Sequence, residues 1–136
     1  MEIIEEAEWW YLPIEDAVVT QSKVDFAFSL SLQMPTNEYF SIRIEQPFTL
    51  QTAAGLIEFH AQERITELGP ALALHQKVVR SGRAYKNGVL TFIFSDGTIL
   101  NAHPDPQGNY EGWTLADTGQ PRTLIVCLPS GGLAIW

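Results

Sequence analysis

Two stretches near the start of the chain alternate regularly between apolar and polar residues. Residues 24–32 carry an apolar side chain at every second position, and residues 39–45 repeat this pattern after a break at Pro35-Thr36-Asn37. A period of two residues is typical of a β-strand with one buried face. The two stretches therefore predict an antiparallel hairpin.

The segments on either side of this hairpin carry weaker patterns. Residues 17–21 contain several β-branched side chains and predict a short first strand, with a bend at Ser22-Lys23. Residues 50–76 show no regular period and leave their structure open. Within them, a proline at the start of an apolar run and a base at its end predict one short helix over Pro70–Gln76.

The dipeptides Asn87-Gly88 and Asp96-Gly97 divide residues 78–102 into three runs. Such dipeptides favour two-residue type I′ loops, because both loop residues must adopt a positive φ. The three runs therefore predict a meander with the strands Val78–Lys86, Val89–Ser95 and Thr98–Ala102. Two-residue loops would pair Tyr85 with Leu90, Phe94 with Ile99, and Ile93 with Leu100.

The middle run of this meander has apolar residues on both of its faces. An antiparallel sheet that is covered on both faces needs a second layer, supplied by another sheet or by its own curvature. Later strands are predicted at Tyr110–Leu115, Arg122–Leu128 and Leu133–Trp136, with Trp136 as a core or seam residue. The predicted fold is all-β: a single antiparallel β-sandwich or partly open β-barrel of about seven to nine strands.

Length and composition agree with one globular unit. At 136 residues and 46% hydrophobic content, residues 1–136 are predicted to form a single β-rich domain. The lone cysteine, Cys127, lies in an apolar run and is expected in the core. The N-terminus lacks a signal-peptide pattern, and no apolar run approaches the roughly 18 residues that a membrane span needs. These features predict a cytoplasmic protein.

The charge of the chain is strongly acidic and unevenly distributed. The formal net charge is −8, which disfavours nucleic acid and anionic membranes as partners and favours a basic protein. Residues 1–22 hold acids but no Lys or Arg, whereas residues 64–86 hold most of the bases. The alternative is that this charge serves only solubility.

The acidic N-terminal segment also contains three adjacent aromatic residues. Trp and Tyr are over-represented in binding hot spots, and neighbouring acids suit a basic partner. The candidate partner-binding residues are Glu5, Glu6, Glu8, Trp9, Trp10, Tyr11, Glu15 and Asp16. The alternative is that one or two of these rings cover the open end of a sheet.

No pattern of residues predicts a catalytic or metal site. His103 and Asp105 flank prolines in a sequence typical of a turn, in which the Asp105 side chain is expected to bond to the local backbone. Paired metal-ligand spacings are missing. Ser130 lacks the preceding glycine of a nucleophile elbow. Glu111 lies between Tyr110 and Trp113, and a carboxylate among aromatic rings can act as an acid. The alternative is an outward-pointing side chain.

Three short motifs follow one another in the C-terminal half: Phe94-Ser95-Asp96-Gly97, Tyr110-Glu111-Gly112-Trp113 and the final Gly131–Trp136. In this order they resemble the motifs of a family of small, uncharacterised bacterial proteins. This family usually has alanine where Gly112 stands and a third glycine where Ser130 stands; neither difference challenges the fold. A weaker resemblance links the chain to immunity proteins of bacterial toxin systems.

Two functions from different classes follow. The first is a non-enzymatic protein-binding module, most specifically an immunity-type inhibitor of a basic toxin such as a nuclease domain. It needs no cofactor and would act as a monomer or homodimer. The alternative is a small-molecule-binding β-barrel or a small enzyme that uses Glu111 and His103.

Overall fold

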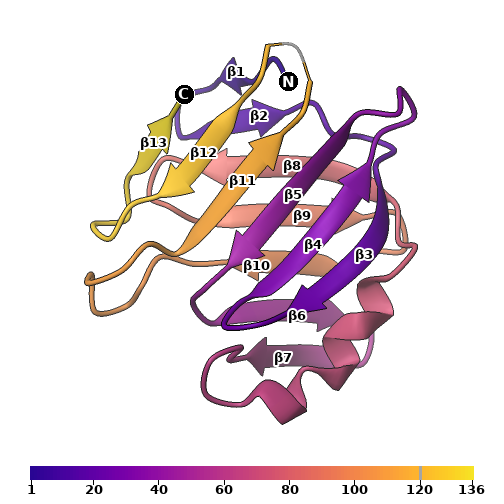
Figure 1. The fold of residues 1–136 in the computed structure, drawn as a ribbon, viewed down its shortest axis with the longest axis vertical. Coiled ribbons are helices and arrows are strands. Elements are labelled where there is room, and N and C mark those ends of the chain that lie inside the picture. Colours follow the sequence, from indigo (N-terminus) through magenta and orange to yellow (C-terminus); the bar gives the residue numbers. More distant parts are fainter. Residues whose placement is uncertain (120) are drawn as a thin grey trace.

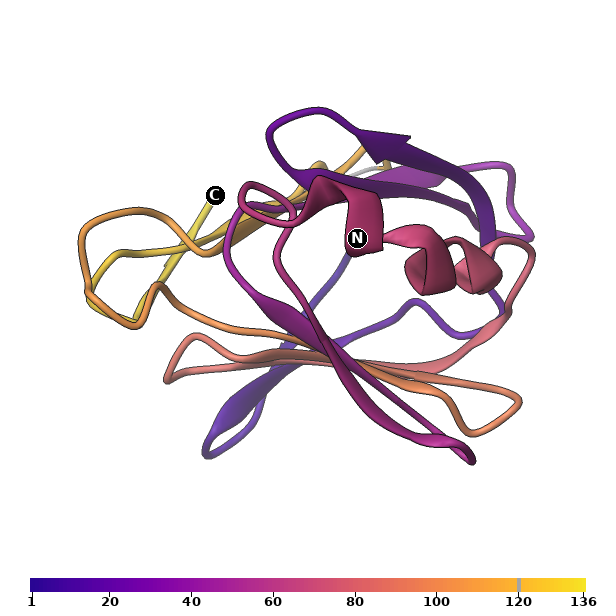
Figure 2. The same ribbon diagram turned by 90° about the horizontal axis from the view of Figure 1, so that it is seen from below.

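The computed structural model describes residues 1–119 and 121–136, which form two antiparallel β-sheets packed face to face (Figure 1, Figure 2). The first sheet has seven strands in the order β1-β2-β8-β9-β10-β6-β7. In that order the strands span Ile4–Glu5, Trp9–Leu12, Val79–Tyr85, Leu90–Phe94, Ile99–Ala102, Phe48–Thr52 and Gly55–Phe59. The β1–β2 hairpin and strand β7 thus lie on opposite edges of this sheet.

The second sheet has six strands in the order β13-β12-β11-β5-β4-β3. In that order the strands span Leu133–Ile135, Leu124–Cys127, Trp113–Asp117, Tyr39–Ile44, Phe28–Gln33 and Val18–Val24. Strand β4 shows how the sequence builds this layer: Phe28, Leu30 and Leu32 are buried, and the residues between them are partly exposed. The predicted hairpin of β4 and β5 is confirmed.

Aromatic side chains join the two sheets. Phe28 of β4 stacks on Phe48 of β6 with 5.1 Å between ring centroids, and Phe48 stacks on Phe59 at the same distance. Trp113 of β11 is buried and donates its indole N–H to the Gly88 carbonyl, 2.7 Å away in the β8–β9 turn. The hydrophobic core therefore lies between the sheets, as in a sandwich.

Residues 65–74 form two short 3-10 helices near β7 and β3 (Figure 1). The first spans Ile65–Glu67 and the second spans Gly69–Leu74, in which Ala71 and Leu74 are buried. The helix predicted over Pro70–Gln76 is thus present in shortened 3-10 form, since Gln76 has a positive φ of 67°. No helix in the described part of the chain is long and apolar enough to cross a bilayer.

The predicted all-β sandwich is confirmed, and the alternative of a barrel is wrong because the strands form two separate sheets. The number of strands is larger than predicted, with thirteen in the described residues. Strands β1, β2, β6 and β7 were not predicted. The first two are short, β7 lies in the stretch with irregular periodicity, and β6 overlaps the start of that stretch.

The predicted two-residue loops of the meander are wrong, because each loop has three residues and ends on glycine. Tyr85 donates its N–H to the Val89 carbonyl (2.8 Å), and Gly88 has a positive φ of 101°. The second loop repeats this geometry at Gly97 (φ 89°). A type I turn followed by a left-handed glycine has this form. The extra residue shifts the pairing by one position, so Ala84 pairs with Leu90, Ile93 with Ile99, and Phe92 with Leu100.

The C-terminal strand forms as predicted, but the predicted burial of Trp136 is wrong. Strand β13 is an edge strand, where Leu133 and Ile135 pack against the core. Trp136 exchanges backbone hydrogen bonds with Leu124, but its side chain is 69% exposed. The alternation along a strand directs it away from the core.

The predicted bend at Ser22-Lys23 is also wrong, because β3 continues to Val24. The chain turns instead at Asp25, whose carboxylate accepts a hydrogen bond from the Ala27 backbone N–H (3.0 Å). A side chain that bonds to the backbone two residues later stabilises such a turn.

Candidate functional site

The predicted N-terminal binding residues meet the end of β8 on one edge of the seven-stranded sheet. Strand β2 pairs with β8, so that Trp9 faces Tyr85 and Tyr11 faces Arg83. Residues directly opposite each other in an antiparallel pair share a face. We call this edge region the β2–β8 surface and define it as Glu5, Glu6, Glu8, Trp9, Tyr11, Arg83, Tyr85 and Lys86. Glu5 lies opposite Trp10 and is therefore on the other face from Trp9.

Trp9 is the most tightly held aromatic side chain of this surface. Its ring centroid lies 6.0 Å from that of Tyr85, with the planes tilted by 55°. The guanidinium carbon of Arg83 lies 4.4 Å from the Trp9 centroid, which is the geometry of a cation–π contact. All three side chains, however, are only partly buried or exposed. The ring is therefore fixed in orientation yet open to a partner.

Trp10 points to the other side of β2. It is partly buried and packs against the hydrophobic core, with the Lys86 ammonium 5.9 Å from its ring centroid. Lys86 also forms an ion pair with Glu5 (Nζ to Oε2, 2.7 Å). The sequence left two roles open for these aromatic residues, partner binding or covering the sheet. Trp10 covers the sheet.

The acids of the segment do not gather in one place. Glu6 and Glu8 are exposed at the turn of the β1–β2 hairpin, where the Glu6 N–H donates to the Trp9 carbonyl (2.9 Å). The Glu8 carbonyl accepts from Lys86, at one end of β8. Asp16 donates its N–H to Val79, at the other end. The length of β8 is about 20 Å at 3.3 Å per residue.

Glu15 and Asp16 consequently lie apart from the β2–β8 surface. Asp16 is exposed and has a positive φ of 69°, which marks it as part of a tight turn. In sequence the two acids belong to the same acidic segment as Glu8, but the four residues of β2 intervene. The structure therefore joins five of the eight predicted residues in the β2–β8 surface, turns Trp10 toward the core, and leaves Glu15 and Asp16 outside.

Three residues of the surface were missed by the sequence analysis. Arg83, Tyr85 and Lys86 come from a strand far from the N-terminus in sequence, and pairing of β2 with β8 brings them in. The alternation of β8 places Arg83 and Tyr85 on one face, and this pattern was the only sign in the sequence that the two side chains share a surface. Their pairing partner was not readable, because β2 was not predicted as a strand.

The loop that holds His103 and Glu111 behaves as a structural turn. The Asp105 carboxylate accepts backbone N–H groups from Gln107 (3.0 Å), Asn109 (3.1 Å) and Tyr110 (3.0 Å). These bonds lower the pKa of Asp105 below its usual range, and the bond from Gln107 has the largest effect. The prediction that Asp105 bonds to its local backbone is confirmed.

Glu111 is exposed at the end of this loop, while His103 is half-buried. The backbone at Gly112, next to Glu111, lies close to the backbone at His103. A Cβ atom built on Gly112 would lie 2.5 Å from the His103 carbonyl oxygen. In the described residues no hydrogen bond or ion pair joins the Glu111 and His103 side chains. The enzyme alternative that uses this pair stays a prediction.

Cys127 is buried in β12, so its predicted place in the core is confirmed. Burial raises the pKa of the Cys127 thiol above its ordinary value. The thiolate is the nucleophilic form, so this environment disfavours a reactive cysteine.

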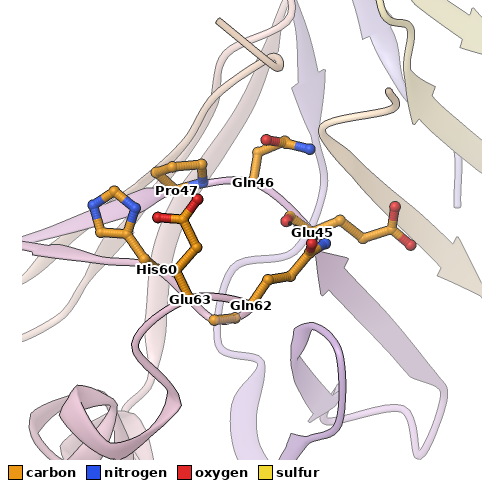
Figure 3. A pocket seen from close by; sticks show the side chains of 7 residues that line it. Glu45, Gln46, Pro47, His60, Gln62 and Glu63 are labelled. Atoms are coloured by element: carbon orange, nitrogen blue, oxygen red, sulfur yellow. Dashed lines mark hydrogen bonds between the residues drawn. The ribbon is translucent and has the colours of Figure 1, made fainter. Parts of the chain in front are cut away.

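A small polar hollow lies where β5 leads into β6 and where β7 ends (Figure 3). Its lining includes Glu45, Pro47, His60, Gln62 and Glu63, and its volume is about 50 Å³. Figure 3 shows the Glu63 side chain pointing toward His60, while the Glu45 carboxylate points away. Ligand pockets usually measure about 300–1,000 Å³, so this hollow is too small for a metabolite. Among the described residues, no group of three acidic, His or Cys side chains could hold a metal ion.

Comparison with known protein families gives one match. Residues 10–136 match the family described as "Family of unknown function (DUF6188)". The chain belongs to this family. The matched range includes half of the β2–β8 surface, namely Tyr11, Arg83, Tyr85 and Lys86, and it includes both sheets apart from β1 and Trp9.

The predicted resemblance to a family of uncharacterised proteins is thereby confirmed, while the resemblance to immunity proteins stays a prediction. No curated protein and no solved structure matches the chain significantly. The description of DUF6188 names no activity, so function must be argued from the residues.

Proposed function

We propose that this member of DUF6188 is a non-enzymatic protein-binding module that binds a basic partner through the β2–β8 surface. The observation that carries the proposal is the partly exposed Trp9 ring, which contacts Tyr85 and the Arg83 guanidinium on an outer sheet face. Hot spots of protein interfaces are enriched in Trp, Tyr and Arg. This surface offers one of each in mutual contact.

The fixed orientation of Trp9 favours binding for an entropic reason. Ordering a mobile side chain at an interface costs about 0.5–1.5 kcal/mol. A ring that already packs on its neighbours in the free protein avoids much of this cost. The Trp9 contacts at 6.0 Å and 4.4 Å supply that order before a partner arrives.

Charge supports a basic partner. Glu6 and Glu8 are exposed beside the aromatic residues, and the chain has a formal net charge of −8. Glu5, in contrast, is paired with Lys86 inside the surface. Complementary charges mainly increase the association rate and specificity. The more specific proposal is an immunity-type inhibitor that neutralises a basic bacterial toxin domain, such as a nuclease.

The test is neutralisation in living cells. The product of the gene immediately upstream is expressed in a sensitive bacterium with and without this protein, and survivors are counted. Protection by the wild type, together with a co-purifying complex, is the expected result. Trp9→Ala and Glu8→Lys should reduce protection, and Tyr110→Ala, which removes a 68% exposed ring elsewhere, should not.

With the purified complex, the association rate constant should fall steeply as salt is added, because screening weakens steering between exposed charges. A rate that does not depend on salt contradicts the role assigned to Glu6 and Glu8. Equal protection by Trp9→Ala and wild type contradicts the role assigned to the aromatic residues.

A further inference from the structure

The four outermost strands of the two sheets differ in how they are protected against pairing with other chains. Folded proteins usually shorten, bulge or charge such edge strands. Strand β1 has two residues and β13 has three. Strand β3 has a register shift between Val19 and Gln21 and carries Lys23. Each of these three edges therefore has a feature that opposes pairing.

Strand β7 is the least protected of the four, because Glu58 is its one charged residue and the strand is neither shortened nor bulged. It spans five residues, Gly55–Phe59, pairs with β6 in an unbroken register, and contains no Lys or Pro. Its first four residues are exposed, with Leu56 65% and Ile57 41% exposed. Figure 2 shows the β6–β7 hairpin extending away from the six-stranded sheet. An exposed apolar edge strand of this kind is a template for another strand.

The exposed side chains of β7 lie on both faces of the sheet. Leu56 is opposite Gln51 of β6, on the outer face, and Ile57 is opposite the buried Leu50, on the inner face. A strand added beside β7 would therefore cover apolar surface on both sides. Backbone hydrogen bonds would supply the remainder of the contact.

We infer that β7 pairs antiparallel with β7 of a second copy of this chain, about a two-fold axis at Ile57. A two-fold interface requires a strand that is complementary to itself. In this register Ile57 faces the partner's Ile57, Leu56 faces the partner's Glu58, and Gly55 faces the partner's Phe59.

The residues of β7 fit this register. Glu58 is the one charged residue of the strand and lies opposite leucine, whereas an axis at Glu58 would place two carboxylates opposite each other. Gly55 has open space where a Cβ atom would stand, so the backbone of a second copy can approach it closely, while Phe59 stays buried against Phe48 of its own chain. A second copy in this register therefore avoids opposing charges and has room at Gly55.

The dimer should be weak at low ionic strength. Each copy has a formal net charge of −8, so two copies repel each other. One short strand per copy also makes an interface smaller than the roughly 1,600 Å² of a standard complex. Added salt screens the repulsion and strengthens the dimer. This is opposite to the salt effect expected for a basic partner, so the two proposals can fail independently.

The first experiment is sedimentation velocity on the full chain, from micromolar to near-millimolar concentration and at low and high salt. The wild type should shift from monomer to dimer as concentration and salt increase. Ile57→Lys should remain monomeric, because it places two ammonium groups opposite each other. Leu72→Lys is the matched control: it makes the same charge change at a 52% exposed residue outside the strand and should dimerise.

The second experiment tests the register. Directly opposite residues have Cα atoms about 4.5–5.5 Å apart, which is within the range of a disulfide. Ile57→Cys should therefore form a covalent dimer on mild oxidation. Glu58→Cys should not, because its copy lies two residues further along the partner strand. Wild type that stays monomeric throughout, dimerisation lost equally in Leu72→Lys, or equal cross-linking of both cysteine variants would overturn the inference.

Discussion

At the scale of single residues, Gly112 shows how a close backbone contact restricts a position. A Cβ atom there would lie 2.5 Å from the His103 carbonyl oxygen and 3.0 Å from the Cys127 sulfur. Because one neighbour is backbone and the other is buried, neither can move cheaply. We expect Gly112→Ala to lower the free energy of unfolding by about 1–3 kcal/mol, the usual cost of overpacking. Urea unfolding measures this change.

The matched control for this prediction is Gly69→Ala. Gly69 lies in the second 3-10 helix, and no atom lies within 4 Å of its built Cβ position. The substitution should leave stability unchanged or raise it slightly, since alanine restricts the unfolded chain. Equal losses in both variants would show that the space around Gly112 is not the cause.

At the scale of elements, strand β13 separates the role of a backbone from that of a side chain. Deleting Leu133–Trp136 should prevent soluble folding, because it uncovers the core beneath Leu133 and Ile135 and leaves β12 without a partner. Trp136→Ala should change the free energy of unfolding by less than about 0.5 kcal/mol, since exposed side chains contribute little. Soluble yield and thermal unfolding distinguish these outcomes. A truncated chain with an unchanged melting transition contradicts the first expectation.

At the scale of the whole molecule, Trp113 connects the two sheets. Its indole N–H bonds to the Gly88 carbonyl (2.7 Å) in a buried environment. Trp113→Phe keeps most of the ring but leaves this carbonyl without its donor, which costs about 1–3 kcal/mol. Denaturant unfolding should show this loss, whereas Trp9→Phe, at a partly exposed ring, should show a smaller one. Equal losses would indicate that ring volume rather than the hydrogen bond matters.

The arrangement of the whole molecule also separates its two proposed contacts. The β2–β8 surface and strand β7 lie at opposite edges of the seven-stranded sheet. Pairing through β7 would therefore leave one β2–β8 surface at each end of a sheet that runs through both copies. Such a dimer could bind two partners at once, or one partner with two sites.

Much of the fold was predictable because its signals are local. The alternation of apolar and polar residues in β4 and β5 identifies strands and their buried faces directly, since neighbouring side chains point to opposite sides. The glycines at positions 88 and 97 mark turns for a similar reason. Their loop type was not predictable to the residue, because the same dipeptides serve two-residue and three-residue loops.

By itself, the sequence determined the all-β class, most of the central strands, the buried cysteine and the turn at Asp105. Only the tertiary structure decided which strands became neighbours, and so which side chains met. Trp9 contacts Arg83 and Tyr85 because β2 pairs with β8, and Glu15 is separated from Glu8 because β2 intervenes. Trp136 is exposed because β13 lies at an edge. Local periodicity specifies a strand and its faces, whereas sheet order depends on packing between segments distant in sequence.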